Sequence, residues 1–209
     1  DMEYRIERDS MGEMQVPADR YWAAQTQRSF QNFKIGGEIM PREITHAFGI
    51  LKKAAAIANF NLGKMDEEKK NVISQACDEV IAGDLNDHFP LVVWQTGSGT
   101  QSNMNANEVI ANIALEKLGK EKGDYKFCHP NDHVNNAQST NDVYPSCGKM
   151  ALIKKIDRLL DALMRLTDTL NKKAQEFDSV VKMGRTQLQD AVPIRLGQEF
   201  QAYSVAIRR

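Results

Sequence analysis

Hydrophobic residues recur at intervals of three and four along most of the chain, a spacing that predicts helices. Apolar stripes over 18–31 and 42–62 end at glycines, and Asp66 caps a third pattern that runs to Gly83. Residues 3–17 alternate weakly instead and predict a short strand or hairpin. The pattern therefore predicts a mainly α fold with one short β element.

The longest apolar pattern lies in the last third of the chain. Its members follow one another at spacings of 3, 4, 3, 4 and 3: Ile153, Ile156, Leu160, Leu163, Thr167 and Leu170. Such a seam is typical of a long helix that packs in a bundle at a shallow angle. From Pro145 to Phe177 this helix would exceed about 45 Å, at a rise of ~1.5 Å per residue. Because 209 residues offer little to cover it, we expect a helix of another subunit on this seam.

These patterns predict two domains: an N-terminal helical domain over residues 1–140, and the first part of a central helical bundle over 141–209. The last helical pattern runs to Arg209 without a C-cap or a polar tail. A periodic helix that stops in this way predicts that the polypeptide is part of a longer protein.

Composition excludes several classes of partner. A net charge of −1 and an isoelectric point near 6.5 give no basis for binding nucleic acid or an anionic membrane surface. No apolar run approaches the ~18–20 residues of a membrane-spanning helix, and no signal-like segment opens the chain, so we expect a soluble protein. Three scattered cysteines without CxxC spacing favour free thiols in a reducing cytoplasm over a disulfide framework or a zinc site.

The first of three polar stretches is Gln95–Glu108, where two glycines alternate with hydroxyl residues ahead of a helical pattern. Glycine permits positive φ and lets backbone N–H groups approach a ligand. Ser102 or Asn103 would cap the helix, and a helix N-terminus favours anions. Because the loop has no Lys or Arg, it suggests a small carboxylate rather than a nucleotide triphosphate. A simple polar turn is the alternative.

The second polar stretch, His129–Asp142, holds two histidines four residues apart. A zinc site needs three or four ligands, no further ligand is evident, and Pro130 disfavours the regular helix that would align His129 with His133. We therefore predict no metal. Later in the stretch, three small polar residues precede a helix and could bind substrate or serve only as a cap: Ser139, Thr140 and Asn141.

The third polar stretch, Met183–Pro193, contains Arg185, Thr186 and Gln187. Arg185 could pair with a substrate carboxylate or with Asp190, and the sequence does not separate the two. Three stretches rich in hydroxyl and amide groups, each ahead of a long helix, indicate a binding site, since a purely structural scaffold has no need of them.

These stretches resemble the signature regions of the aspartase/fumarase superfamily, whose members eliminate ammonia or water from four-carbon dicarboxylates. The resemblance covers the whole chain, and its most specific motifs are Gly97-Ser98-Gly99-Thr100, Ser102-Asn103-Met104-Asn105 and Pro130-Asn131-Asp132-His133-Val134-Asn135. It implies a set of substrate-binding residues: Ser98, Gly99, Thr100, Ser139, Thr140, Asn141 and Thr186. It also implies a second dicarboxylate site at His129, Pro130, Asn131 and Asp132.

The same resemblance implies a mechanism without any cofactor. Removal of the C3 proton gives an aci-carboxylate, which preorganised N–H, hydroxyl and amide donors stabilise. Thr186 and Gln187 fall at catalytic positions, and Gln187 stands where fumarases have a histidine. The family's general base is a serine in a third signature region that this sequence does not reach, so we expect the chain alone to be inactive. The family further implies a homotetramer whose sites are shared between subunits.

Two substrates remain open on these motifs. Ser98 and His129 lie in motifs similar to class II fumarases, whereas Ser139–Asp142 and Met183–Pro193 resemble aspartases. Departing water needs a proton donor, which a glutamine cannot be near neutral pH, whereas ammonia can leave from a substrate ammonium. Gln187 therefore favours a lyase that converts L-aspartate to fumarate. The alternatives are a class II fumarate hydratase and a helical oligomerisation module without a catalytic role.

Overall fold

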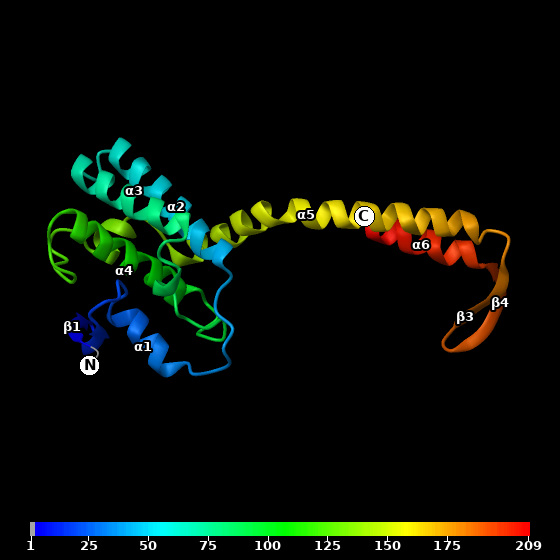
Figure 1. Cartoon of the computed structure of the whole chain (residues 1–209), viewed down its shortest axis with the longest axis horizontal. Coiled ribbons are helices and arrows are strands. Elements are labelled where there is room, and N and C mark those ends of the chain that lie inside the picture. Colours follow the sequence, from blue (N-terminus) through cyan, green and yellow to red (C-terminus); the bar gives the residue numbers. More distant parts are fainter. Residues whose placement is uncertain (1–2) are drawn as a thin grey trace. The chain divides into compact units, whose positions relative to one another are not determined.

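A computed structural model describes residues 3–209 of the protein (Figure 1). In chain order its elements are β1 (Tyr4–Asp9), β2 (Gly12–Pro17), α1 (Ala24–Asn32), α2 (Arg42–Asn61), α3 (Glu67–Ala82), a 3-10 turn η1 (Asn86–His88), α4 (Thr100–Lys117), a π-helical turn η2 (Pro130–Val134), α5 (Thr140–Glu176), β3 (Val181–Thr186), β4 (Gln189–Arg195) and α6 (Leu196–Arg208). They form two compact units, the first ending at Leu152 and the second comprising Ile153–Arg209. The predicted mainly α fold is confirmed, and the predicted domain boundary at residue 140 stays a prediction.

The N-terminal β element is an antiparallel hairpin, as predicted. β1 pairs with β2 from Tyr4 opposite Pro17 to Asp9 opposite Gly12. Gly12 turns the chain with a φ of 116°, a conformation that glycine adopts without steric cost. Val16 is fully buried in the core of the first unit. The hairpin is therefore anchored to this core by its second strand.

The core of the first unit is built around α4. Nearly every side chain from Ser102 to Leu115 is buried, because α1, α2, α3 and η2 all pack against this helix. α2 and α3 approach each other closely at Gly49, where a Cβ atom would lie 3.0 Å from the Cys77 carbonyl oxygen. Since α4 is buried on all sides, its polar side chains must find their hydrogen-bond partners inside the protein.

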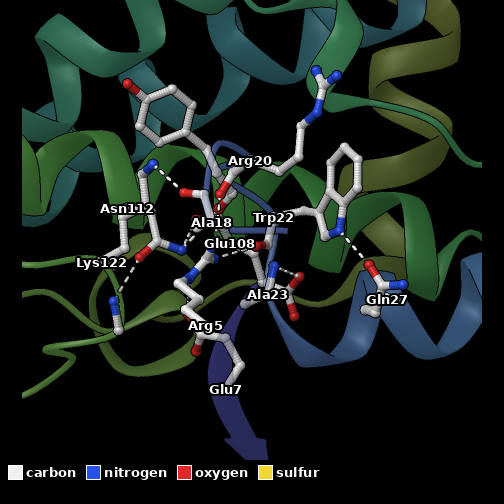
Figure 2. A network of polar contacts seen from close by, with 12 residues as sticks. Arg5, Glu7, Ala18, Arg20, Trp22, Ala23, Gln27, Glu108, Asn112 and Lys122 are labelled. Atoms are coloured by element: carbon white, nitrogen blue, oxygen red, sulfur yellow. Dashed lines mark hydrogen bonds and ion pairs between the residues drawn. The ribbon is translucent and has the colours of Figure 1, made fainter. Parts of the chain in front are cut away.

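The first helix starts later than its sequence pattern predicts, at Ala24 rather than Ala18. The preceding segment, residues 17–23, is held by side chains from elsewhere in the first unit (Figure 2). Arg5 and Lys122 donate at 2.6–2.9 Å to four of its carbonyl oxygens, those of Pro17, Ala18, Arg20 and Trp22. These bonds hold the segment in a non-helical conformation, and α1 begins only beyond it.

α4 begins at Thr100, and the prediction that Ser102 or Asn103 caps it is wrong. The N-cap is Gly99, which has a left-handed φ of 81° and no capping side chain. Ser102 and Asn103 are buried within the first turns of the helix. The tertiary contacts around α4 therefore use these two side chains for packing and internal hydrogen bonds rather than for capping.

The long helix predicted from the seam is confirmed, because Thr140–Glu176 forms the single helix α5. It starts before Pro145, whose missing N–H removes one hydrogen bond near the helix start. On the seam, Ile153 and Leu160 are 68% and 47% exposed, so residues 3–209 cover this face only in part. None of the helices described, α5 included, is both long and apolar enough to cross a bilayer.

The second unit contains a hairpin that was not predicted. β3 and β4 pair in antiparallel fashion, with a bulge between Met183 and Arg185. The two turn residues, Gln187 and Leu188, have φ values of 50° and 64°. Left-handed backbone is uncommon for these residue types, so the sequence carries no recognisable turn signal at this point.

α6 returns along the C-terminal part of α5. The rings of Phe177 and Phe200 lie 5.4 Å apart, and Ser204 Oγ donates to Asn171 Oδ1 at 2.6 Å. The closest approach is at Gly197, where a Cβ would lie 2.2 Å from the Ala174 carbonyl oxygen. Only glycine permits this approach, so Gly197 fixes where α6 begins its packing.

Candidate functional site

The glycine loop that precedes α4 presents a chain of hydroxyl groups. Thr96 Oγ1 lies 3.1 Å from Ser98 Oγ, which donates to Thr100 Oγ1 at 3.3 Å. The three residues are exposed, and Thr100 is the first residue of α4, whose leading N–H groups have no helical acceptor. Hydroxyls and N–H groups at a helix N-terminus suit the binding of an anion.

Gly99 lets this loop pack against α5. Besides its positive φ of 81°, a Cβ at Gly99 would lie 2.3 Å from the ring of Tyr144. Gly97 also has a positive φ, 77°, but a Cβ there would meet nothing within 4 Å. The two glycines therefore differ: Gly99 is needed for backbone conformation and for packing, Gly97 for conformation alone.

Asn103 joins the glycine loop region to the second polar stretch. Its Nδ2 atom donates to Thr140 Oγ1 at 2.9 Å and to Asn135 Oδ1 at 3.1 Å. Since Thr140 Oγ1 accepts this bond, the hydroxyl hydrogen of Thr140 is left to donate elsewhere. Ser139 accepts at 3.2 Å from the N–H of Asn141. The starts of α4 and α5 are thus held together by one buried amide.

Of the two histidines of the second stretch, His129 caps η2 and His133 bonds to the backbone of that cap residue. His129 Nδ1 accepts from the N–H groups of Asn131 and Asp132 at 3.0 and 3.2 Å. His133 Nδ1 accepts from the N–H of His129 at 2.7 Å. Both rings therefore use a nitrogen for backbone bonds, and within residues 3–209 no three metal-ligating side chains gather at one place.

A cleft of about 540 Å³ in the first unit brings Thr100 together with His129, Pro130 and Asn131. Asp132, the fourth residue of the implied second dicarboxylate site, is exposed beside them. The opposite wall comes from the β1–β2 turn and the start of α1, through Arg8, Asp9, Ser10, Ala23, Ala24 and Gln25. Residues of the two implied dicarboxylate sites thus share one cleft.

Glu108 lies at the base of this cleft and was not singled out by sequence reasoning. It is buried, and its carboxylate accepts from the N–H groups of Ala23, Gln25 and Thr26 at 2.8–3.2 Å. Burial raises the pKa of Glu108 to about 7, although these backbone bonds favour the charged form. Glu108 therefore acts as the cap that α1 lacks locally, and Figure 2 shows it beside Ala23.

Lys52 is a second residue that sequence reasoning missed. It lies on α2, is fully buried, and donates to the side chains of Asn135 and Gln138 at 2.9 and 3.0 Å. A signal was present, because Lys52 stands four residues after Phe48, a residue of the predicted apolar stripe. A lysine at such a position is unusual in a core.

Thr186 and Gln187 belong to the second unit. Thr186 ends β3, Gln187 opens the turn, and both are exposed. Beside them, Arg185 Nε lies 3.1 Å from Asp190 Oδ1 across the hairpin. Of the two roles left open for Arg185, the ion pair with Asp190 is thus the one formed in this structure.

Comparisons of sequence and of structure with known proteins indicate the same family. The lyase family (Lyase_1) matches residues 12–209. A class II fumarate hydratase from Campylobacter jejuni is 56% identical over 97% of this chain and 44% of its own length. The structure of fumarate lyase:delta crystallin from Brucella melitensis bound to cobalt matches with a TM-score of 0.82 and 48% identity, over 99% of this chain and 45% of that one. A class II fumarase from Schistosoma mansoni matches with a TM-score of 0.81 and 40% identity, over 99% and 44%.

These comparisons correct the substrate prediction. The curated relatives at 54–57% identity are named class II fumarate hydratase, so the prediction of an aspartate ammonia-lyase is wrong. That prediction gave Gln187, one side chain on an exposed turn, more weight than the fumarase-like motifs at Ser98 and His129. This chain spans less than half the length of those relatives. Since the family match extends from residue 12 to residue 209, the chain belongs to the lyase family of the aspartase/fumarase superfamily.

Proposed function

We propose that the whole protein containing this chain is a class II fumarate hydratase, which interconverts fumarate and L-malate. The observation that carries the proposal is 56% identity to a class II fumarate hydratase over 97% of this chain. The hydroxyl groups of the glycine loop and the start of α5, arranged around buried amides, support it because they suit a small dicarboxylate.

The proposed chemistry follows from the weak acidity of the C3 proton of malate. Its removal places a second negative charge on the adjacent carboxylate before the C2 hydroxyl group takes up a proton and leaves as water. Donors fixed before the reaction stabilise such a charge, and losing one typically costs about 2–4 kcal/mol of barrier. We assign this role to Ser98, Thr100, Thr140 and Asn141, with Ser139 holding the backbone of Asn141. The residue that removes the proton is not among them.

We propose that the active site is completed by oligomerisation, as a homotetramer. The exposed apolar residues of α5, such as Ile153 and Leu160, suit burial against helices of other subunits. Thr186 and Gln187 would then meet the starts of α4 and α5 from another copy. We further propose His129, Pro130, Asn131 and Asp132 as a second dicarboxylate site, reached through the 540 Å³ cleft.

The test is to purify the whole protein and supply L-malate and L-aspartate separately, following fumarate by its ultraviolet absorbance. We expect fumarate from malate and none from aspartate. Ammonia release from aspartate without malate turnover would overturn the proposal.

Thr140→Val should lower kcat/KM on the order of a hundredfold, because it removes one preorganised donor. Thr140→Ser, which keeps the hydroxyl, should retain most of the activity.

A further inference from the structure

Lys52 occupies an unusual position in the first unit. It is among the largest fully buried side chains described, and its two acceptors are amide oxygens rather than carboxylates: Asn135 Oδ1 at 2.9 Å and Gln138 Oε1 at 3.0 Å. Burial lowers the pKa of Lys52 to about 7. An isolated ammonium in a core is costly, so a purely apolar side chain would be the simpler solution at this place.

Each hydrogen bond that leads from Lys52 toward Thr140 has a defined donor and a defined acceptor. Lys52 Nζ donates in both of its bonds, and Asn135 presents its oxygen to it. The amide nitrogen of Asn135 is independently used, since it donates to the Gln138 carbonyl oxygen at 3.0 Å. Both ends of the Asn135 amide are thus assigned by their partners, which removes the usual ambiguity of amide orientation.

The side-chain amide of Asn103, the next member of this series of hydrogen bonds, is oriented in the same way. Asn135 Oδ1 also accepts from Asn103 Nδ2 at 3.1 Å, so Asn103 must present its nitrogen to this site. The same nitrogen donates to Thr140 Oγ1 at 2.9 Å. The Thr140 oxygen is therefore an acceptor inside the protein, and its hydroxyl hydrogen remains available to donate to a ligand.

We propose that Lys52 is a positioning residue for the dicarboxylate substrate: through Asn135 and Asn103 it fixes Thr140 as a hydrogen-bond donor toward the substrate carboxylate. This inference rests on the proposed function, because it needs a carboxylate ligand at Thr140. The ammonium and the neutral amine both carry at least two N–H groups, so either form supplies the two bonds to Asn135 and Gln138.

Lys52 also braces the loop that carries Thr140. Asn135 and Gln138 bond back to the loop's own carbonyl groups, with Gln138 Nε2 donating to Val134 and Asn136 at 3.0 and 3.1 Å. Within this loop Ala137 has a φ of 57°, a strained conformation for alanine. The two bonds from Lys52 hold the loop in a form that its backbone alone would not favour.

The first test is Lys52→Met in the whole protein, which keeps the apolar stem and removes the donor. We expect kcat/KM for fumarate to fall about tenfold to a hundredfold, mainly through KM, as for a lost hydrogen bond to a charged ligand. Lys53→Met is the matched control, since Lys53 is the next residue and pairs with Asp78 at 2.7 Å instead. Val80→Ala is the stability control, because it opens a buried cavity in α3 and should leave KM unchanged.

A double-mutant cycle then asks whether the effect passes through Thr140. On a Thr140→Val background, Lys52→Met should change kcat/KM by less than about twofold, because the hydroxyl it orients is gone. An unchanged tenfold or larger loss on that background would overturn the proposal.

If Lys52→Met does not fold, Asn135→Leu and Asn135→Asp replace it. The first removes the acceptor that links Lys52 to Asn103 and should raise KM, whereas the second keeps that acceptor and should raise KM far less; equal effects would overturn the proposal.

Amide hydrogen exchange gives a readout that is independent of the substrate. Lys52→Met should speed exchange across residues 135–141 at least tenfold and leave the centre of α3 unchanged, whereas equal protection in both variants would overturn the bracing role. If the wild-type protein turns over neither malate nor fumarate, the proposed function fails by that result alone. The exchange experiment still decides whether Lys52 holds the loop.

Discussion

Asn103 on α4 donates a hydrogen bond of 2.9 Å from Nδ2 to Thr140 Oγ1 at the start of α5. This single contact joins the first turn of α4 to the first residue of α5, through two residues that lie 37 positions apart in the sequence. It also decides the hydrogen-bonding direction of the Thr140 hydroxyl. Mutations of Asn103, of the glycine loop, of the buried Glu108 and of the exposed turn of the second unit should each have a distinct effect.

Replacing Asn103 should separate the two helix starts. Asn103→Leu preserves size but leaves Thr140 Oγ1 and Asn135 Oδ1 without this donor, at a cost of about 1–3 kcal/mol in unfolding free energy. We expect kcat/KM to fall at least about tenfold as well. The control is Asn107→Leu, one turn later, because Asn107 is equally buried and its Nδ2 donates only weakly, at 3.8 Å, to Met104 Sδ. Urea unfolding measures the unfolding free energy and steady-state kinetics measures kcat/KM. Equal losses in Asn103→Leu and Asn107→Leu would contradict this prediction.

The two glycines of the loop should respond differently to alanine. Both have positive φ, which costs a non-glycine residue about 1–2 kcal/mol. At Gly97 this is the whole expected loss of stability, since the added Cβ meets nothing within 4 Å. At Gly99 the Cβ would lie 2.3 Å from the Tyr144 ring, so we expect a further loss from displacing α5 or the loop. Thermal unfolding of the two variants measures the difference, and equal losses would show that the Tyr144 contact adjusts freely.

Glu108 should make stability depend on pH in a defined direction. Its folded pKa is about 7 against an ordinary value of 4.5, so the folded state binds the proton more tightly than the unfolded state. The unfolding free energy from this group is therefore greatest below pH 4.5 and decreases as the pH rises through 7. The full change is about 3 kcal/mol, an upper value for one buried group.

Glu108→Gln should abolish this decrease, because glutamine does not titrate. Chemical unfolding at a series of pH values between 4.5 and 8 measures it, with the exposed Glu121→Gln as the control that keeps the slope. The same slope in Glu108→Gln and the wild type would mean that another group titrates. The cap on α1 itself should weaken in Glu108→Gln, since one oxygen that accepts N–H groups becomes a donor.

Gln187→His should leave the fold intact. Gln187 is exposed on the β3–β4 turn with a φ of 50°, and histidine tolerates left-handed backbone better than most residues. A histidine there can supply a proton near neutral pH, so malate turnover should increase and gain a pH dependence near pH ~6.5. Rates measured across this range, beside Gln187→Asn as a non-titrating control, check the prediction. An identical pH profile in both variants would exclude a proton-transfer role for position 187.

The sequence by itself determined the helical framework and the family. The 3-4 seam from Ile153 to Leu170 predicts α5, because helical periodicity is a local property of the chain. Asp66 and Gly83 mark the two ends of α3 for the same reason, since caps depend on the few residues around them. The motifs around Gly97 and Pro130 were sufficient to place the chain in its superfamily.

Other features depended on contacts between residues far apart in the chain, which periodicity does not report. α1 starts at Ala24 because Arg5 and Lys122 bind the carbonyls before it. The β3–β4 hairpin turns at Gln187, where no typical turn residue stands. The start of α1 thus depends on tertiary contacts that override local propensity, whereas the exposed β3–β4 turn follows from the pairing of its two strands.

The single side chain of Gln187 did not determine the substrate preference. The hydrogen-bond network of the candidate site was decided only by the tertiary structure. In the sequence, Lys52 only interrupts an apolar stripe, and Asn103 and Glu108 are ordinary polar residues of a predicted helix. Folding buries all three and brings each to partners 32 to 86 residues away. A buried polar group must be paired, and which partner it finds is fixed by the packing of α1, α2, α4 and the loop before α5 rather than by its neighbours in the chain.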